Sequence, residues 1–330
     1  MFNELVDIKE ENLLQANNEI LSTLLFDNTT KKNIIWASDN YEGYGDGFSF
    51  SQEITIDKIT GKYEGVIKPR SRKTSNEKLK RIKDNGEVFT PSWICNEQNN
   101  LVDDAWFGKK NVFNVSEQKK WIANESKIEF TKDKTWQDYV KSLRLEISCG
   151  EAPYLVSRYD TVTGKSIKIS DRIGLLDRKL RVLSENVDLE NEWIDWSIVA
   201  VKSIYGYDLQ GDNILLAREN ILYTYIDYYK DKFNKKPSLD LIKEIAKIIS
   251  WNIWQMDGLK FVIPRSCKNE IIKEYTLFGD IETKTECTGC KTNNYKDHNG
   301  IYCKIMNWEK NKTVKFYTLV NKKWGEIDGE

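Results

Sequence analysis

The stretch Leu145-Glu-Ile-Ser-Cys-Gly-Glu-Ala-Pro-Tyr-Leu155 decides how the rest of the chain is interpreted. Its first three residues are typical of a short β-strand, and a turn that contains Gly150 follows at once. In α/β proteins, a strand that ends in such a turn at the edge of a parallel sheet borders the crevice where nucleotides bind. Glycine lets the backbone approach that ligand closely because it has no Cβ atom. A buried strand before an ordinary tight turn would have the same pattern, so the flanking sequence must decide.

Two further strand and helix units follow this stretch. Residues 203–208 predict a strand that ends in Asp208, and an amphipathic helix begins directly after it. Residues 238–258 repeat the arrangement with a helix, a strand and Asp257 at the tip. Strands that alternate with helices predict a parallel sheet, so Glu146, Asp208 and Asp257 should face one crevice. An acid at the tip of the second strand is the group that binds ribose hydroxyls in nucleotide folds.

The other segments indicate mainly packing. Helical spacing of apolar residues over 4–25 predicts an N-terminal amphipathic helix. Short β-type runs separated by glycines over 33–67 predict a small sheet with tight turns. Residues 171–201 predict two helices with a boundary near Asp188. At 90–91, Thr-Pro can open a helix, and the N-terminus of a helix attracts a carboxylate.

Residues 68–83 contain eight basic residues and one acid, which is the strongest local cluster of positive charge. Clustered Lys and Arg neutralise phosphates and release counterions, and this gives the sequence-independent part of nucleic-acid affinity. A solvated loop and helix face would have the same composition. The candidate contacts to DNA phosphates are Lys68, Arg70, Arg72, Lys73, Lys80 and Arg81.

Overall composition limits the class of protein. The chain has 330 residues, of which 40% are hydrophobic and 12% aromatic, so it can build a core and is not disordered. The net charge of −1 does not by itself indicate a class of binding partner. The acidic start has no signal-peptide pattern, and no apolar run is long enough for a membrane span. We therefore expect a cytoplasmic protein without membrane contact.

Four of the six cysteines lie close together near the C-terminal end. Cys287-Thr-Gly-Cys290 is a Cys-x2-Cys knuckle, Cys303 follows after twelve intervening residues, and the only histidine, His298, lies between them. This set suits tetrahedral zinc, with Cys267 or His298 as the fourth ligand, and it predicts a structural zinc site. Free thiols in a loop are the alternative. A single histidine also argues against a His-based nuclease or hydrolase.

These pieces, in this order, resemble the amino-type adenine-N6 DNA methyltransferases, including the M subunits of restriction-modification systems. The resemblance spans about residues 86 to 260 and rests on Phe89-Thr-Pro91, Glu146-Ile-Ser-Cys-Gly-Glu-Ala152, Tyr205-Gly-Tyr-Asp208 and Met256-Asp-Gly258. It implies that S-adenosylmethionine is the cofactor and double-stranded DNA the substrate, and that Asp208 binds the ribose. The residues implied to bind the cofactor are Phe89, Thr90, Pro91, Glu146, Cys149, Gly150, Asp208, Leu209, Asp257 and Gly258.

The sequence also departs from that family. Ala152 replaces the second glycine of the first motif, and about fifty residues separate the first two strands. The Asn/Asp-Pro-Pro-Tyr/Phe tetrapeptide that holds the flipped base is missing, because no two of the five prolines are adjacent. Glu151-Ala-Pro-Tyr154 is only a superficial look-alike, so the catalytic residues stay unknown. An unusual catalytic loop, a partner subunit with the catalytic or restriction function, and a protein that does not methylate all remain open.

The sequence therefore predicts an α/β protein with a Rossmann-like methyltransferase sheet. We expect an N-terminal β-containing extension with the basic linker over 1–83, the methyltransferase-like part over 84–265 and a small zinc-binding module over 266–330. The predicted function is S-adenosylmethionine-dependent methylation of adenine N6 in DNA. The alternative is a non-catalytic DNA-binding or specificity subunit that acts with a partner. A nuclease is less favoured, because no cluster of two acids and a lysine marks a strand tip.

Overall fold

A computed structural model describes residues 17–88, 90–276 and 279–320, together with Glu10, Leu13 and Gln15. Its centre is a three-stranded parallel sheet of β5 (Arg144–Ile147), β6 (Ile204–Asp208) and β7 (Ile253–Gln255), in that order. All three predicted strands are thus present, as neighbours with their carboxyl ends at one edge. In the described residues β5 has no strand on its outer side, so the finer expectation of a methyltransferase sheet remains a proposal.

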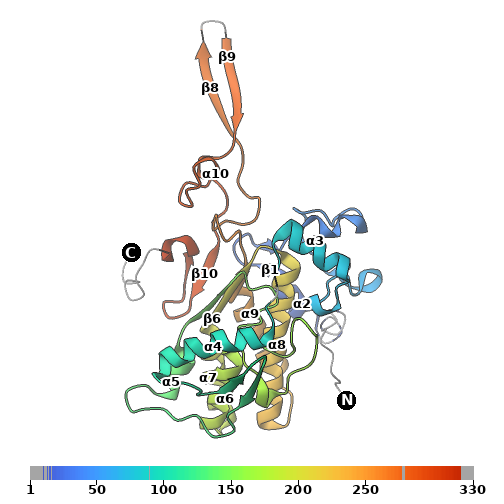
Figure 1. Cartoon of the computed structure of the whole chain (residues 1–330). Helices are drawn as coiled ribbons and strands as arrows, with labels where there is room; N and C mark the ends of the chain where they lie inside the picture. Colours follow the sequence, from blue (N-terminus) through green and yellow to red (C-terminus); the bar gives the residue numbers. More distant parts are fainter. Residues whose placement is uncertain are drawn as a thin grey trace.

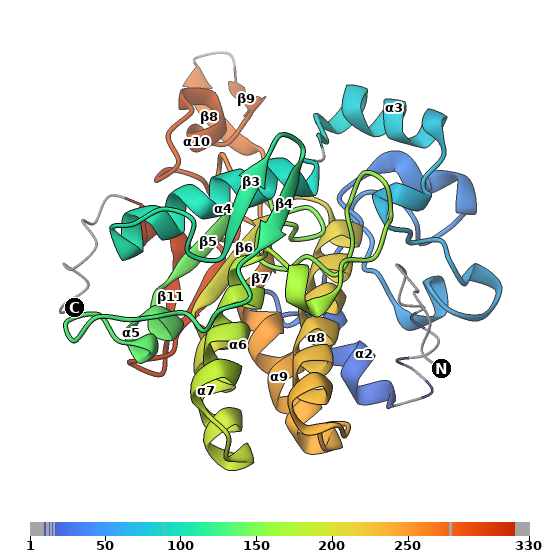
Figure 2. The same cartoon turned by 60° about the horizontal axis from the view of Figure 1, so that its bottom comes forward.

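Four helices cover one face of this sheet (Figure 2). Helices α6 (Leu175–Asn186) and α7 (Glu190–Lys202) connect β5 to β6, and α8 (Gly211–Phe233) and α9 (Leu239–Asn252) connect β6 to β7. Because consecutive strands are neighbours, crossovers of one hand place all the helices on the same face. The main core forms there, with Ile204 and Ile253 pointing into it. The predicted helix boundary near Asp188 is confirmed.

The C-terminal residues cover part of the opposite face. Strands β10 (Lys304–Asn307) and β11 (Lys312–Lys315) form an antiparallel pair, and a 3-10 turn over Phe316–Leu319 follows. Phe316 packs with Tyr207 and Trp254 in a second, smaller core. This cover stops short of β5, where Leu145 is 40% and Ile147 65% exposed.

The segment before β5 forms a layer beside the sheet. It consists of α4 (Ser92–Phe107), the hairpin of β3 (Asn114–Glu117) and β4 (Lys120–Ala123), and α5 (Trp136–Lys141). A buried Arg178 from α6 joins this layer to the body through Asp103 on α4 at 2.6 Å. The predicted helix after Thr90-Pro91 is α4, but its first free N–H groups are not capped by Thr90. Instead, Asp160 accepts the Ser92 N–H at 3.0 Å.

The N-terminal segment differs from its prediction. After α2 (Asn18–Leu25) it has only the two-residue strands β1 (Phe26–Asp27) and β2 (Lys32–Asn33), and then a series of 3-10 turns. These turns cover Asp39–Tyr44, Ile56–Lys58, Gly61–Tyr63 and Arg70–Arg72, and helix α3 (Ser75–Asn85) ends the segment. Of the sheet predicted over 33–67, only one pairing is present: Ile35 and Glu53 form an antiparallel bridge, flanked by backbone hydrogen bonds from Ile54 to Ile34 and from Trp36 to Gln52. The rest of the segment forms local turns. Helix α2 confirms the end of the helix predicted over 4–25, and residues 4–9, 11, 12, 14 and 16 of that range lie outside the described residues.

A long hairpin was not predicted. Strands β8 (Glu270–Thr276) and β9 (Gly279–Thr285) pair over seven residues each, and the short helix α10 (Thr288–Thr292) follows them. Figure 1 shows this hairpin projecting from the body, with α10 near its base. The segment predicted as one C-terminal module is thus divided, since β10 and β11 pack on the sheet while β8 and β9 stand away from it.

Among the described residues, no helix combines the length and the apolar composition that crossing a bilayer requires.

Candidate functional site

A pocket of about 240 Å³ opens at the carboxyl ends of β5 and β6. Its walls come from the loop before α4, the turn after β5 and the start of α8. Six of the residues predicted to bind a cofactor line it: Thr90, Glu146, Cys149, Gly150, Asp208 and Leu209. The structure therefore brings together two of the three predicted strand tips and the loop that contains Thr90.

The turn after β5 has an unusual backbone. Ser148, Gly150 and Ala152 all have positive φ values, of 49°, 52° and 62°. Glycine adopts this region at no cost, whereas a residue with a Cβ atom is strained there, and such strain is frequent at binding sites. The Gly150 N–H donates to Asp208 Oδ2 at 3.0 Å. The first strand tip is thus fixed directly to the acid of the second.

Both pocket acids are buried, and burial raises the pKa of each. Burial raises the pKa of Asp208 to about 6, although the N–H groups of Gln210 and Gly150 and the Asn213 side chain, which donate to its carboxylate, act in the opposite direction. Burial likewise raises the pKa of Glu146 to about 8 against the hydrogen bonds from the N–H groups of Tyr154 and Leu155. Near pH 7, Asp208 is thus mainly ionised and Glu146 mainly protonated.

The basic segment is partly buried beside this pocket. Lys73 is 7% exposed and lies 3.8 Å from Asp212, and Arg81 is 3% exposed and forms ion pairs with Asp212 and Glu87. Burying such charges is tolerable only when they are paired. The prediction that Lys73 and Arg81 contact DNA phosphates was therefore wrong, since both side chains are turned into the protein.

The other four predicted phosphate contacts have more solvent access. Arg72 and Lys80 are exposed, and Lys68 and Arg70 are half-buried. Lys68 lies 3.7 Å from Glu77, and the Arg70 backbone N–H donates to Glu151. Their role in binding DNA stays a prediction.

Several predicted residues lie outside the pocket wall. Pro91 directly precedes α4 and does not line the pocket. Asp257 accepts the N–H groups of Leu259 and Lys260 in a local turn, and Gly258 packs against the ring of Tyr207, which a Cβ atom would meet at 2.9 Å. The local turn and this packing account for an acid and a glycine at the third strand tip without a bound ligand. Phe89 lies outside the described residues.

The look-alike of the catalytic tetrapeptide is also divided. Pro153 and Tyr154 line the pocket. Glu151 is buried beneath it and accepts the Tyr159 hydroxyl at 2.7 Å. The Glu151 side chain therefore holds the turn and does not face a ligand.

Three polar residues of the pocket, Glu87, Gln210 and Asn213, were not predicted from the sequence. Gln210 and Asn213 follow Asp208 at the start of α8, where the first turn of a helix surrounds a strand tip, so their position was a usable signal. Glu87 is 9% exposed and accepts a hydrogen bond from Gln210 at 3.2 Å. No sequence pattern indicated that Glu87 lines the pocket, because its partner Gln210 lies 123 residues further along the chain.

The Cys-rich segment forms a second site. Cys267, Cys287, Cys290 and His298 present ligand atoms that all lie within 4.8 Å of one another. The three sulfur atoms are 3.6, 3.7 and 3.7 Å from His298 Nδ1. Tetrahedral zinc with Zn–S and Zn–N bonds of about 2.3 and 2.05 Å requires S···N separations of about 3.6 Å. This cluster could therefore hold a metal such as zinc, in agreement with four of the five predicted ligands.

Cys303 does not belong to this cluster, so its prediction as a ligand was wrong. Its buried thiol lies 3.4 Å from the carbonyl oxygen of Gln255, at the end of β7. The Cys-x2-Cys spacing identified the knuckle, but it could not decide which distant cysteine completes the set. Cys267 and Cys287 instead flank the projecting hairpin, so a metal ion here would close its base.

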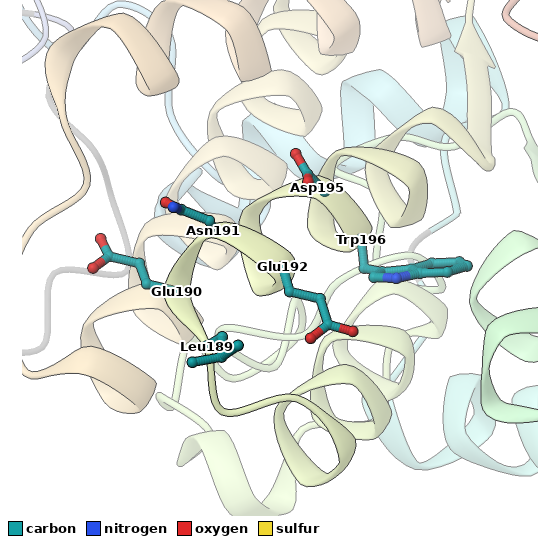
Figure 3. A pocket seen from close by; sticks show the side chains of 6 residues that line it. All are labelled: Leu189, Glu190, Asn191, Glu192, Asp195 and Trp196. Atoms are coloured by element: carbon teal, nitrogen blue, oxygen red, sulfur yellow. The ribbon is translucent and has the colours of Figure 1, made fainter.

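A further hollow lies at the start of α7 (Figure 3). It is lined by Leu189, Glu190, Asn191, Glu192, Asp195 and Trp196, which all belong to the first turns of one helix or the residue before it. Figure 3 shows these side chains pointing in different directions, so they do not converge on a ligand. The pocket at β5 and β6 and the Cys-His cluster remain the two candidate sites.

Comparison of the chain with models of protein families, with curated proteins and with solved structures found no match.

Proposed function

We propose that the chain binds S-adenosylmethionine and methylates adenine N6 in double-stranded DNA, in the cytoplasm, as part of a restriction-modification or phage system. The observation that carries the proposal is the pocket that Thr90, Glu146, Gly150 and Asp208 line together. It lies beyond the carboxyl ends of adjacent parallel strands, which is where open α/β sheets bind ligands. The order of the strands also agrees with one half of a doubly wound sheet.

The charge of the pocket supports this class of ligand over a phosphorylated nucleotide. Of its three acids, Glu146 is mainly protonated near pH 7 and Glu87 is paired with Arg81, so Asp208 supplies the negative charge of the pocket. None of the described lining residues is a lysine or an arginine. A pyrophosphate would lack a cationic partner here and would face an ionised Asp208. A nucleoside that carries a sulfonium cation has the opposite charge, and an acid at the second strand tip can accept its ribose hydroxyls.

The remaining features fit the same proposal. The basic segment borders the pocket, and Lys68, Arg70, Arg72 and Lys80 would contact phosphates beside it. The Cys-His cluster would hold a structural zinc ion, because three thiolates and one imidazole fill a tetrahedral shell and leave no open position for chemistry.

A second candidate function is a non-catalytic subunit that keeps the cofactor pocket and works with a partner. Two observations favour it. The sequence contains no pair of adjacent prolines, so the tetrapeptide that would hold the target base is missing. In the described residues, no strand pairs with the outer edge of β5, and Ile147 at the end of this strand is largely exposed. A partner chain could complete both the sheet and the catalytic group.

Calorimetric titration with S-adenosylmethionine tests the common part of these proposals. We expect one ligand per chain for the wild type and binding weakened at least tenfold in Asp208→Ala. Adenosine diphosphate is the control ligand, since it has a nucleoside but carries phosphates, and it should bind much more weakly. Absence of S-adenosylmethionine binding by the wild type would contradict both functions.

Transfer of a radiolabelled methyl group to DNA of mixed sequence separates the two candidates. Labelled DNA, with the label recovered in N6-methyladenine, supports the enzyme. Cofactor binding without labelled DNA supports the non-catalytic subunit.

A further inference from the structure

Helix α3 contacts the rest of the protein in an unusual way. Of its described side chains only Arg81 is buried, and its apolar residues Leu79 and Ile82 are 64% and 40% exposed. A capping box at Thr74 and a left-handed Gly86 define its two ends. Hydrophobic burial therefore contributes little to its placement, and the Arg81 guanidinium is its principal buried attachment.

The Arg81 guanidinium reaches two walls of the pocket. Its Nε donates to Glu87, which lines the pocket, and its Nη2 lies 2.8 Å from Asp212. The same Nη2 donates to Asn213 Oδ1 at 3.4 Å, and Asn213 in turn donates to Asp208 Oδ1 at 3.3 Å. Two consecutive hydrogen bonds thus connect α3 with the carboxylate at the second strand tip.

We propose that Arg81 is a positioning residue that holds Glu87 and, through Asn213, Asp208 in the arrangement that forms the pocket. The geometry requires an arginine. Its planar fork presents donors to several acceptors at once, whereas a lysine ammonium acts as a single point charge and cannot span Glu87, Asp212 and Asn213 together. The inference deepens the proposed function, and it rests on that function only for the identity of the ligand.

Two backbone amides report this positioning without any ligand. The Glu87 N–H donates to the Arg81 carbonyl oxygen at 3.3 Å, and the Gln210 N–H donates to Asp208 Oδ1 at 2.9 Å. Both should exchange with deuterium slowly in the wild type. In Arg81→Lys we expect exchange of these two amides to become about tenfold faster and S-adenosylmethionine to bind about tenfold more weakly.

Arg178→Lys is the matched control. Arg178 is another buried arginine fork, bound to Asp103, Asn96 and Asn100, and it has no partner in common with Arg81. Its replacement should lower thermal stability comparably while exchange at Glu87 and Gln210 and affinity for S-adenosylmethionine stay at the wild-type values. A general loss of packing would affect both variants alike, so equal effects on exchange would overturn the inference.

Glu87→Gln gives a second test if Arg81→Lys does not fold. It keeps the volume and the bond to Gln210 but removes the charge that Arg81 pairs with, so exchange at Glu87 should still accelerate. Unchanged exchange at both amides in the folded variants would overturn the inference. Failure of the wild type to bind S-adenosylmethionine would instead contradict the proposed function, and the exchange data would still decide the role of Arg81.

Discussion

At the scale of single residues, the ionisation of Asp208 should control affinity for a cationic ligand. Burial raises the pKa of this carboxyl to about 6, so it gains its negative charge between about pH 5 and pH 7. We expect the affinity for S-adenosylmethionine to rise about tenfold over this interval, because the ionised form attracts the sulfonium. Calorimetry at pH 5, 6 and 7 measures the change. In Asp208→Asn the affinity should be low and nearly independent of pH.

Glu146 should make the protein less stable as the pH rises. Burial raises its pKa from 4.5 to about 8 in the folded chain, so the folded state binds this proton more tightly than the unfolded state. The resulting stabilisation is complete below pH 4.5 and is lost as the pH rises toward 8, and it amounts to at most about 5 kcal/mol.

Glu146→Gln tests this effect because it cannot ionise. The free energy of unfolding is measured in urea at pH 5 and pH 8. It should be higher for the wild type than for the variant at pH 5, and this difference should shrink or reverse at pH 8. A constant difference between the two proteins at both pH values would contradict the assignment.

Prediction from the sequence succeeded in placing the tips of the first two strands side by side. Glu146, Gly150 and Asp208 meet because parallel neighbouring strands end at one edge, a consequence of chain order that alternating elements reveal. It failed for Arg81, because the basic composition of residues 68–83 suggested that this side chain faces solvent or DNA phosphates. Its burial depends on Asp212, which lies in another element, and no local pattern encodes such a pairing.

At the scale of elements, the Cys-His cluster should fix the base of the hairpin formed by β8 and β9. This two-stranded element projects from the body, and isolated hairpins are only marginally stable. Removing the metal with a chelator should therefore accelerate amide exchange in Glu270–Thr276 at least tenfold while β6 stays protected.

Elemental analysis of two variants identifies the ligands independently. We expect the wild type to retain about one metal ion per chain, and the variant with both Cys287→Ser and Cys290→Ser to retain none. Cys303→Ser should keep it, because that thiol faces Gln255 and not the cluster. Loss of metal from Cys303→Ser would contradict the assignment of Cys267, Cys287, Cys290 and His298 as the ligands.

Helices and strands were predicted correctly where the pattern of apolar residues extends over many residues. The helices α6 to α9 were recognisable because their apolar residues recur over long segments. The runs in 33–67 alternate for only a few residues between glycines, so they form one antiparallel bridge, between Ile35 and Glu53, and turns elsewhere. The hairpin was missed because both its faces are polar in part, so its residues lack the alternation that one buried face would impose.

At the scale of the whole molecule, the sheet separates two cores of unequal size, and the C-terminal segment is needed to close the smaller one. Phe316 is 9% exposed, and its ring centroid lies 5.1 Å from that of Trp254 on β7 and 5.7 Å from that of Tyr207 on β6. Residues after the Cys-His cluster thus return to the body. The C-terminal region therefore should not behave as an independent domain.

Phe316→Ala tests this dependence. We expect the free energy of unfolding to fall by about 3 kcal/mol, because a buried aromatic ring is removed from a core that has few other members. Leu259→Ala is the control, since Leu259 is 87% exposed and its loss should change stability by less than about 0.5 kcal/mol. A single cooperative urea transition, with its midpoint at a lower urea concentration in Phe316→Ala, would indicate that both faces of the sheet fold together. Two separate transitions, of which only the second is shifted, would show instead that the small core folds apart from the large one.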